Sequence, residues 1–490
     1  MASKIAIAVA KGDGIGPEIM DATLHILKAA KLPLEYKFVE MGNDYYKKGF
    51  STGMTPEAKE TVESTRILLK GPMETPKGLG VKSINVTSRK VWSTFANKRV
   101  FRTLPGVETV FSKAGINIDL TLFRENIEDT YGGIEHFQTT DVAQCRRLIT
   151  RVGSEQIHRA AFEMAKLKDT TRVTCCHKAN IMKLTDGLFL ETFYKVAKEY
   201  PGVKADDAIV DDLAMKLVTR PDKYNVLVLP NLQGDIMSDL CAGLVGGLGM
   251  APSANIGDQI SIFEAVHGTA PDIAGKGYAN PTALLMSTIM MLRHLGLHES
   301  SNHIDKALRK TLADGVRTRD LVQLPGYHPA STHDFAEAIV KNLPAEAKSD
   351  VVTVNWDHLS FLKSAKPAVN QMMIGETETS KKTVGTDIFV DSPLLPKDIA
   401  TIINKELEST NLKLVMISNR GTQIWPTGSV YTQLVNHHRC RIELKDSKES
   451  IHESDLLIVV AKIAKHVRVC STEMLLVVND QRKFTLAQGQ

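Results

Sequence analysis

The sequence predicts an α/β protein that carries an additional α+β domain of ferredoxin-like type at its C-terminal end. Up to about residue 345, short apolar runs typical of buried strands alternate with segments of helical period. Residues 346–382 are polar and without a clear period, which indicates a linker. In residues 383–490 the order is strand, helix, two strands, helix, strand, which is typical of a split β-α-β unit.

The composition limits the classes of protein and of partner that need to be considered. The chain has 490 residues, 43% of them hydrophobic and 24% charged, which is ordinary for a globular protein of two or three domains. Sixty Lys and Arg against 56 Asp and Glu leave a net charge of +4, so neither a nucleic acid nor a membrane is the expected partner. No apolar run reaches membrane-spanning length, and the six cysteines form no CxxC spacing. We expect a reducing compartment, the cytoplasm, or the mitochondrial matrix if the source is eukaryotic.

The N-terminal segment predicts a strand, a glycine turn and a helix, in KIAIAVA, KGDGIGP and EIMDATLHILKAA. Gly12, Gly14 and Gly16 follow the spacing G-x-G-x-G-P, which is not the dinucleotide-binding fingerprint. A tight turn that needs positive φ explains them at least as well as contact with a phosphate. Two further strands follow in LEYKFVEMG and RILLKG, and the loop after the second carries Thr75.

Polar and basic side chains then gather in KSINVTSRKVWSTFANKRVFRTLPG and LTLFRENIEDTYGGIEH. The residues concerned are Ser83, Asn85, Arg89, Arg99 and Arg124. Because guanidinium groups match carboxylates bidentately, three converging arginines would suit a small polycarboxylate. The alternative is a set of surface ion pairs with the acids of ENIED. Tyr131 is a candidate proton donor or a half-buried aromatic residue.

Two carboxylates, Asp235 and Asp239, lie four residues apart in a segment of helical period that follows the apolar strand of KYNVLVLPNL. They would project from one face of a helix at the end of a strand, where ligands of α/β sheets gather. Mg²⁺ or Mn²⁺ would neutralise the pair, whereas the alternative is a solvated first turn. Lys178 and Asp211 each end a predicted strand and are a candidate base and a candidate third metal ligand.

A loop rich in Gly, Ala and Pro lies between the strand of ISIFEAV and a strongly apolar helix. Such a loop lets backbone approach a flat ligand closely. His267, Asp272 and Asn280 would supply polar contacts to that ligand.

Seven motifs of this chain resemble, in the same order, those of the metal-dependent β-decarboxylating dehydrogenases, the isocitrate/isopropylmalate dehydrogenase family. The motifs are GDGIGPE, LKGPMETP, SINVTSRK, FRENIEDTYGGIEH, HKANIMK, NLQGDIMSD and EAVHGTAPDIAGKGYANP. The resemblance covers residues 1 to about 345 and is strongest to isocitrate dehydrogenases. The tail, with ISNRGTQIWP, resembles the extra C-terminal domain of the long bacterial type.

The resemblance implies a two-domain fold that is not a Rossmann fold. A large α/β domain would comprise residues 1–97 and 251–345, and a small domain at 98–250 would carry a dimer interface. The implied reaction is the oxidative decarboxylation of isocitrate to 2-oxoglutarate and CO₂, with Mg²⁺ or Mn²⁺ and reduction of NAD. The implied assembly is a homodimer or higher homo-oligomer with shared active sites.

The resemblance also assigns roles to residues. Those implied for substrate binding are Thr75, Ser83, Asn85, Arg89, Arg99 and Arg124. Those implied for catalysis are the general acid Tyr131 and, from the partner subunit, Lys178 and Asp211, and Asp211 would complete the metal site of Asp235 and Asp239. Those implied for cofactor binding are Glu264, His267, Gly268, Thr269, Ala270, Asp272, Ile273 and Asn280.

Cofactor choice is expected to depend on Asp272 and Ile273, because NADP enzymes of the family commonly carry Lys-Tyr after HGTAP. A carboxylate accepts hydrogen bonds from ribose hydroxyls and repels a 2′-phosphate, which favours NAD. Arg317 and Arg319 would partly offset this, which keeps NADP as the alternative.

Three other interpretations stay open at this point. One is a sister enzyme for 3-isopropylmalate or homoisocitrate, and another is a catalytically silent regulatory subunit. The third concerns the tail, which serves assembly in the interpretation that we favour and senses a ligand in the other.

Overall fold

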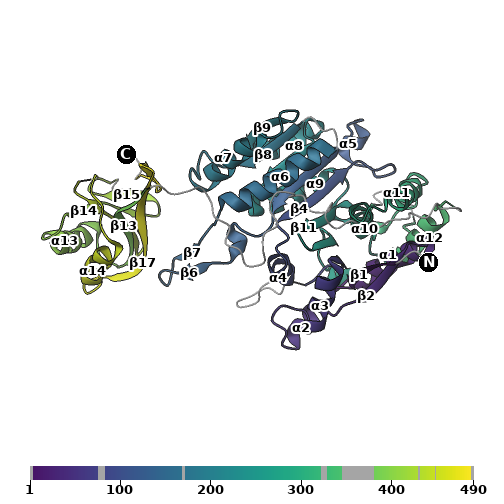
Figure 1. The fold of residues 1–490 in the computed structure, drawn as a ribbon, viewed down its shortest axis with the longest axis horizontal. Helices are drawn as coiled ribbons and strands as arrows, with labels where there is room; N and C mark the ends of the chain where they lie inside the picture. Colours follow the sequence, from purple (N-terminus) through teal and green to yellow (C-terminus); the bar gives the residue numbers. More distant parts are fainter. Residues whose placement is uncertain are drawn as a thin grey trace. The chain divides into compact units, whose positions relative to one another are not determined.

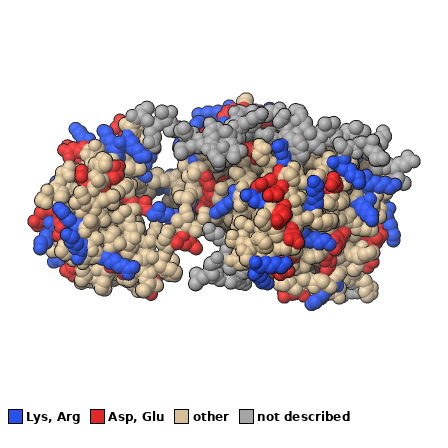
Figure 2. Space-filling model, turned by 60° about the horizontal axis from the view of Figure 1, so that its bottom comes forward, with Lys and Arg blue, Asp and Glu red and all other residues tan. Residues whose placement is uncertain are grey.

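The computed structural model describes residues 4–74, 83–167, 172–321, 328–344, 380–428, 431–446 and 448–486. The chain forms two compact units. One comprises Met1–Tyr131, Leu148–Ala179 and Asp186–Gln371, and the other Gly132–Arg147, Asn180–Thr185 and Met372–Gln490. Among the described residues, no helix is both long and apolar enough to cross a bilayer. On the face drawn in Figure 2, acidic and basic side chains are interspersed, as the near balance of charge predicts.

A mixed sheet of ten strands forms the centre of the first unit (Figure 1). Its strands are β1 (Ile5–Ala10), β2 (Leu34–Phe38), β3 (Ile67–Lys70), β4 (Ala96–Arg102), β5 (Asp119–Glu125), β8 (Arg172–His177), β9 (Lys204–Ile209), β10 (Val226–Leu229), β11 (Pro252–Ile256) and β12 (Ser261–Ala265). The order is β2-β1-β3-β12-β11-β4-β5-β10-β8-β9. Strands β12, β11, β4 and β5 are antiparallel to their neighbours at the centre, and both flanks are parallel. The antiparallel centre distinguishes this sheet from an all-parallel doubly wound sheet.

Helices cover this sheet and position the site. They are α1 (Gly16–Ala29), α2 (Asn43–Lys47), α3 (Pro56–Thr65), α4 (Ile84–Val91), α5 (Val110–Lys113), α6 (Arg151–Leu167), α7 (Thr185–Ala197), α8 (Val210–Thr219), α9 (Asn231–Leu244), α10 (Thr282–His294), α11 (His298–Ala313) and α12 (Thr332–Lys341). Helices α6 and α9 both pack on β4, β5 and β10. They contact opposite faces, because Lys98 of β4 meets Met164 of α6 whereas the next residue, Arg99, meets Ser238 of α9.

The glycine turn between β1 and α1 is a scaffold. Gly12 and Gly14 have φ of 77° and 58°, where a side chain is strained. A Cβ on Gly12 would lie 2.3 Å from the carbonyl oxygen of Pro72, and one on Gly14 would lie 2.1 Å from that of Thr269. The turn therefore packs directly against the loop of Thr269, as Ile15 N also shows by donating to the Thr269 carbonyl at 2.9 Å.

The predicted ferredoxin-like domain is confirmed. It consists of β13 (Lys381–Asp391), α13 (Pro396–Leu407), β14 (Leu412–Asn419), β15 (Thr422–Trp425), β16 (His437–Leu444), α14 (Glu453–Ile463), β17 (Arg468–Val478) and β18 (Gln481–Arg482). The sheet order is β15-β14-β16-β13-β17-β18, and every pairing is antiparallel. The short β15 and β18 extend the expected four strands at each edge. The predicted linker lies almost entirely outside the described residues.

A hairpin of β6 (Glu135–Phe137) and β7 (Ala143–Cys145) belongs to the second unit, which the sequence did not indicate. Ser471 Oγ donates to Gln138 Oε1 at 3.0 Å, and Thr139 Oγ1 donates to Asn436 Oδ1 at 3.1 Å. Arg146 forms an ion pair with Glu473 at 2.8 Å. The C-terminal domain therefore contacts the segment that directly follows Tyr131.

Candidate active site

Two buried arginines form the base of the candidate site. Arg99 on β4 is 4% exposed and Arg124 on β5 is 1% exposed. The strands are antiparallel neighbours, and the register pairs Asn97 with Arg124, two residues from Arg99. Both guanidinium groups consequently lie on the face that α9 covers, where they meet Asp235.

The two carboxylates of α9 face these arginines, as the four-residue spacing predicts. Asp235 accepts hydrogen bonds from Arg124, from Arg99 at 3.5 Å and from the Tyr131 hydroxyl at 2.6 Å. Asp239 lies 3.8 Å from Arg99. Gly234 allows the close approach of α9 and β5, because a Cβ there would lie 2.7 Å from Cγ of Arg124.

Burial and charge set the protonation states of these groups. Burial raises the pKa of Asp235, but Arg124 and Arg99 outweigh it and hold the pKa below its usual value. Asp239 has a raised pKa because burial outweighs the attraction of Arg99. Burial also raises the pKa of Tyr131, against the opposing effect of Arg124, so its hydroxyl keeps its proton at neutral pH.

Two buried guanidinium donors in the site have no hydrogen-bond partner among the described residues. Nη2 of Arg124 and Nε of Arg89 are buried and have no hydrogen-bond partner in the described part of the chain. Burial, and then the neighbouring guanidinium groups, lower the pKa of both Arg99 and Arg124. Because buried donors without partners are costly, the cluster favours binding of a further anion.

Arg89 is held by a buried network that sequence reasoning missed. Glu264 accepts hydrogen bonds from Lys70, from Arg89 at 3.1 Å and from Asn255 at 2.6 Å. Burial raises the pKa of Glu264, but Lys70 and Arg89 outweigh it and lower the pKa far below its usual range. Lys70 is 1% exposed and donates to Asn85 Oδ1 at 2.9 Å. A lysine that directly follows the apolar run of residues 67–69, at the end of a buried strand, was the available signal for this network.

Asn97, Ser253 and Asn255 extend this network across β4 and β11. Nδ2 of Asn97 donates to Ser253 at 2.9 Å and to Asn255 at 2.7 Å, while its Oδ1 accepts from Arg99 at 2.8 Å. On β11 the polar Ser253 and Asn255 alternate with apolar residues, and this alternation was a further signal in the sequence.

A pocket of about 270 Å³ brings together predicted substrate and cofactor residues. Its lining includes Asn85, Arg89, Arg99, Glu264, His267, Gly268 and Thr269. Nε2 of His267 is buried there without a hydrogen-bond partner among the described residues, while its Nδ1 lies 3.0 Å from the Gly268 carbonyl oxygen. Burial lowers the pKa of His267, so the neutral ring presents one unused nitrogen.

The rest of the predicted cofactor loop follows this pocket. Ala270 has a φ of 38°, which is unusual for a residue with a side chain and places it in the left-handed region. Asp272 is exposed, and its backbone oxygen accepts from Lys276 at 2.8 Å. Ile273, half-buried, packs on the core of the first unit. Asn280 donates to Asp320 at 2.9 Å.

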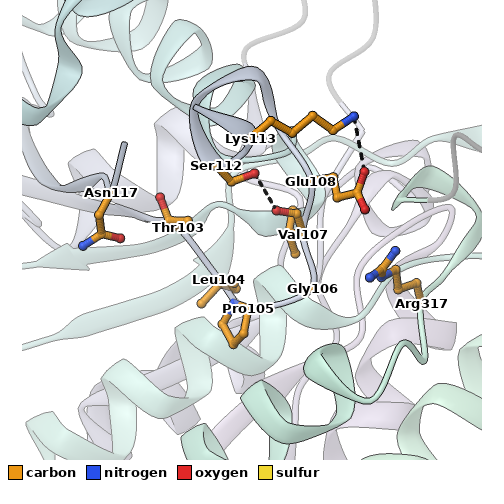
Figure 3. Close-up of a pocket in the computed structure, with 10 residues that line it drawn as sticks. All are labelled: Thr103, Leu104, Pro105, Gly106, Val107, Glu108, Ser112, Lys113, Asn117 and Arg317. Atoms are coloured by element: carbon orange, nitrogen blue, oxygen red, sulfur yellow. Dashed lines mark hydrogen bonds and ion pairs between the residues drawn. The ribbon is translucent and has the colours of Figure 1, made fainter. Parts of the chain in front are cut away.

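Arg317 and Arg319 point to different surroundings. The Arg319 guanidinium lies 5.7 Å from the ring centre of Tyr278. Arg317 lines a separate hollow of about 600 Å³, which Figure 3 shows beside Glu108 and the turn of Leu104.

Lys178 and Asp211 form a second cluster. Their side chains make an ion pair, and the Lys178 amide donates to Asp186 at 2.6 Å. Asp211 lies in the first turn of α8 and does not end β9, because the helix begins at Val210. Within the described ranges, no three His, Cys, Asp or Glu side chains lie together as a metal site would need, so Asp211 does not join Asp235 and Asp239 in one chain.

Two predicted substrate ligands remain. Ser83 caps the N-terminus of α4, where its Oγ accepts from Val86 N at 3.5 Å. Thr75 lies outside the described residues. The substrate, metal and cofactor assignments all stay predictions.

Comparison with known proteins identifies the family of this chain. Residues 6–339 match the isocitrate/isopropylmalate dehydrogenase family, and residues 381–490 match the family described as bacterial isocitrate dehydrogenase, C-terminal domain. The crystal structure of TT0538 protein from Thermus thermophilus is similar over 99% of this chain and 96% of its own, with a TM-score of 0.90 and 42% identity.

Two curated relatives differ in their cofactor. Isocitrate dehydrogenase [NADP] of Thermus thermophilus is 44% identical over 99% of this chain and 96% of its own. Isocitrate dehydrogenase [NAD] subunit 2 of Schizosaccharomyces pombe is 47% identical over 64% of this chain and 83% of its own. The full-length relative carries the NADP name, so the comparisons favour NADP, our alternative, over the NAD expectation. The matches together show that the chain belongs to the isocitrate/isopropylmalate dehydrogenase family.

Proposed function

We propose that the protein catalyses the oxidative decarboxylation of isocitrate to 2-oxoglutarate and CO₂ with reduction of a nicotinamide cofactor. The observation that carries the proposal is the buried cluster of Arg89, Arg99 and Arg124, two of which keep an unused donor. A tricarboxylate would supply the acceptors that these groups lack. The relatives from Thermus thermophilus and Schizosaccharomyces pombe cover 99% and 64% of this chain. Both are named isocitrate dehydrogenases, which supports the same substrate.

The polar end of the pocket argues for isocitrate over 3-isopropylmalate. Asn85 and Lys70 are hydrogen-bonded to each other there, beside the Arg89–Glu264 pair. Nε of Arg89, which lines the same pocket, has no hydrogen-bond partner among the described residues, and an isopropyl group placed against it would leave it unsatisfied at a cost of roughly 1–3 kcal/mol.

Steady-state rates of the purified chain with Mn²⁺ test this function. We expect turnover of isocitrate to exceed that of 3-isopropylmalate and homoisocitrate. A tenfold preference for 3-isopropylmalate would overturn the substrate assignment. Inactivity of the chain by itself, recovered when a second subunit is added, would establish the regulatory-subunit interpretation instead.

Asp235 and Asp239 fit a divalent cation in the type of ligand that they offer, and the described part of one chain lacks a third. Their side chains are 38% and 59% exposed, so both are reachable. We propose that Asp211 of a second copy completes the site. Mg²⁺ or Mn²⁺ bound there would supply Lewis acidity toward the substrate's hydroxyl and carbonyl oxygens.

Two side chains of the protein, Lys178 and Tyr131, carry out the two proton transfers of the reaction. Lys178, held by Asp211, would remove the hydroxyl proton of isocitrate, and a nicotinamide bound at the loop of His267 would accept the hydride from C2, so that oxalosuccinate forms. The arginines retain the carboxylates while the β-carboxylate leaves as CO₂. Tyr131, which keeps its proton because its pKa is raised, then protonates C3 to give 2-oxoglutarate.

Asp239→Asn is expected to raise the Mn²⁺ concentration for half-maximal binding and activity by about tenfold or more, because one anionic ligand is lost. The fold should persist, since Asp239 is exposed and its ion pair with Arg99 is long, at 3.8 Å. Titration with Mn²⁺ measures the change. Asp314→Asn, which removes an exposed carboxylate paired with Lys310, serves as the control. Unchanged metal affinity and turnover in Asp239→Asn would refute the site.

We further propose a homodimer, or a higher homo-oligomer, with shared active sites. Helices α8 and α9 expose apolar side chains, which a partner would cover. These are Met215 and Val218 at 52% each, Leu232 at 38% and Ile236 at 61%. The same helices carry Asp211 and Asp235, so a partner packed there would bring the two separate clusters toward each other.

Within this proposal, NAD is the preferred cofactor because of one residue, Asp272. Asp272 presents an exposed carboxylate in the loop that follows the pocket of His267. The NAD name of the relative from Schizosaccharomyces pombe agrees, whereas the NADP name of the relative from Thermus thermophilus opposes it. We also propose a cytoplasmic location, which the resemblance to bacterial enzymes supports.

The C-terminal domain is proposed to serve assembly. Its α14 exposes Leu457 and Ile458, at 49% and 57%, as a surface for a partner. A chain ending at Pro344 is expected to show a smaller oligomeric mass and lower activity, because the hairpin after Tyr131 loses its contacts with Ser471 and Glu473. Mass and turnover both equal to those of the full chain would count against this role. Light scattering and initial rates measure the two quantities.

A further inference from the structure

A second cavity, of about 470 Å³, lies in the first unit. Strands β4, β11 and β12 form its floor, and α10, α11 and the end of α6 surround it. Figure 1 shows β4, β11 and α10 close together. Its volume falls in the range of about 300–1,000 Å³ that is typical of small-molecule sites.

The cavity lies on the reverse face of the strands that carry the active site. Along β4, Lys98, Val100 and Arg102 line the cavity, whereas Asn97 and Arg99 bond toward β11 and α9 on the other face. The same alternation holds on β11, where Ala254 and Ile256 line the cavity and alternate with Ser253 and Asn255. Because successive side chains of a strand point to opposite faces, this cavity is separate from the pocket of Arg89.

The cavity combines an apolar floor with a cationic rim. Its apolar lining is Val100, Ala254, Ile256, Phe263, Met286, Ile289 and Met290, with Met164 and Leu167 from α6. Methionine side chains adapt to hydrocarbon ligands of irregular shape. The permanent cations of the rim are Lys98, Arg102, Arg293 and Arg309.

Arg293 and Arg309 share one carboxylate of the cavity lining. Asp305 lies 3.2 Å from Arg309 and 3.6 Å from Arg293, and Asp119 lies 3.0 Å from Arg102. Burial, and then the neighbouring arginines, lower the pKa of Arg293 against the attraction of Asp305. At Arg293 and Arg309, two positive charges therefore face the single negative charge of Asp305 beside an apolar surface.

We propose that this cavity binds a small amphipathic monocarboxylate, with its carboxylate at Arg293 and Arg309 and its hydrocarbon chain on the floor around Met290. A tricarboxylate or a dinucleotide does not match the floor, since its polar groups would be desolvated there without partners. A simple inorganic anion would leave the apolar lining uncovered. The proposal does not depend on the reaction assigned to the other face of the strands.

Isothermal titration of the full-length protein with decanoate tests the proposal. We expect one decanoate to bind per chain, both without isocitrate and at saturating isocitrate. Decanol, which lacks the charge, and acetate, which lacks the chain, should each bind at least about tenfold more weakly. Displacement of decanoate by isocitrate would place it in the active site and overturn the proposal, as would equal affinity for decanol.

Variants of the lining locate the site. Arg293→Gln and Arg309→Gln should each weaken decanoate binding by about tenfold, because each removes a charge-assisted hydrogen bond. Met290→Trp should abolish binding by filling the floor. Lys310→Gln removes a neighbouring cation of α11 that pairs with Asp314 outside the cavity, and it should bind decanoate like the parent protein.

Melting temperature and isocitrate turnover report whether each variant is folded. If Met290→Trp does not fold, the decanoate affinity of Arg309→Gln tests the site in its place. Decanoate affinity that is unchanged in both arginine variants, or lowered equally in Lys310→Gln, would overturn the assignment.

Discussion

Replacing Lys178 by methionine is expected to lower kcat by roughly a hundred- to ten-thousandfold, the usual contribution of a positioned acid or base. Tyr131→Phe should lower turnover for a different reason, because it removes the hydroxyl that returns a proton to C3. Both variants should keep the fold of the parent protein. The Lys178 ammonium pairs with an exposed carboxylate, and the Tyr131 hydroxyl makes its hydrogen bond at the half-exposed Asp235.

The two variants together test whether the active site is shared. In one chain, Tyr131 bonds to Asp235 whereas Lys178 bonds to Asp211, which belongs to the separate cluster. If each site takes Tyr131 from one subunit and Lys178 from the other, a mixed dimer has one site with both defects and one intact site. Full subunit exchange of equal amounts should restore about a quarter of the parent activity in a symmetric dimer.

The control is Lys195→Met, which removes an exposed lysine paired with Glu155 and should leave turnover unchanged. Mass spectrometry of differently tagged subunits confirms that mixed dimers form. If they form and no activity returns, Lys178 and Tyr131 do not serve one site from different subunits. An active Lys178→Met variant would remove Lys178 from the mechanism altogether.

The second large effect that we expect is a preference for NAD over NADP of about a hundredfold in kcat/KM. It corresponds to an unfavourable difference on the order of 3 kcal/mol, since each 1.4 kcal/mol is a factor of ten. The cause is Asp272, whose carboxylate accepts from ribose hydroxyls and repels a 2′-phosphate.

Lys276, Arg317 and Arg319 are the basic side chains that bear on this position, and the structure gives the surroundings of each. Lys276 donates to the backbone oxygen of Asp272, and Arg317 lines the hollow in Figure 3. Arg319 lies over Tyr278. These positions leave Asp272 as the residue whose charge is most directly opposed to a 2′-phosphate.

Two variants, one single and one double, separate charge from shape at this position. Asp272→Asn should raise kcat/KM for NADP while leaving that for NAD within about tenfold, because only the repulsion is removed. Asp272→Lys with Ile273→Tyr should reverse the preference. Equal kcat/KM for both cofactors in the parent protein, or the NADP preference that the name of the full-length relative suggests, would show that Asp272 does not govern the choice.

Local patterns in the sequence were sufficient for most elements and for several site residues. The strand, glycine turn and helix at the N-terminus follow from apolar period and turn chemistry. The spacing of Asp235 and Asp239 placed both on one face of α9, because residues four apart stack on a helix. The ferredoxin-like order of the C-terminal domain likewise followed from the succession of periods, since each hairpin and crossover there is short.

Packing between residues far apart in the sequence decided which side chains of these elements contact one another. Glu264 was expected at the cofactor, yet its carboxylate bonds to Lys70 and Arg89, because β12 pairs with β3, nearly two hundred residues earlier in the chain. The hairpin after Tyr131 contacts the C-terminal domain through Glu473, across more than three hundred residues. Neither contact has a local sequence signal. Strand order and domain docking are set by the free energy of the whole chain, whereas periodicity reports only which face of one element is buried.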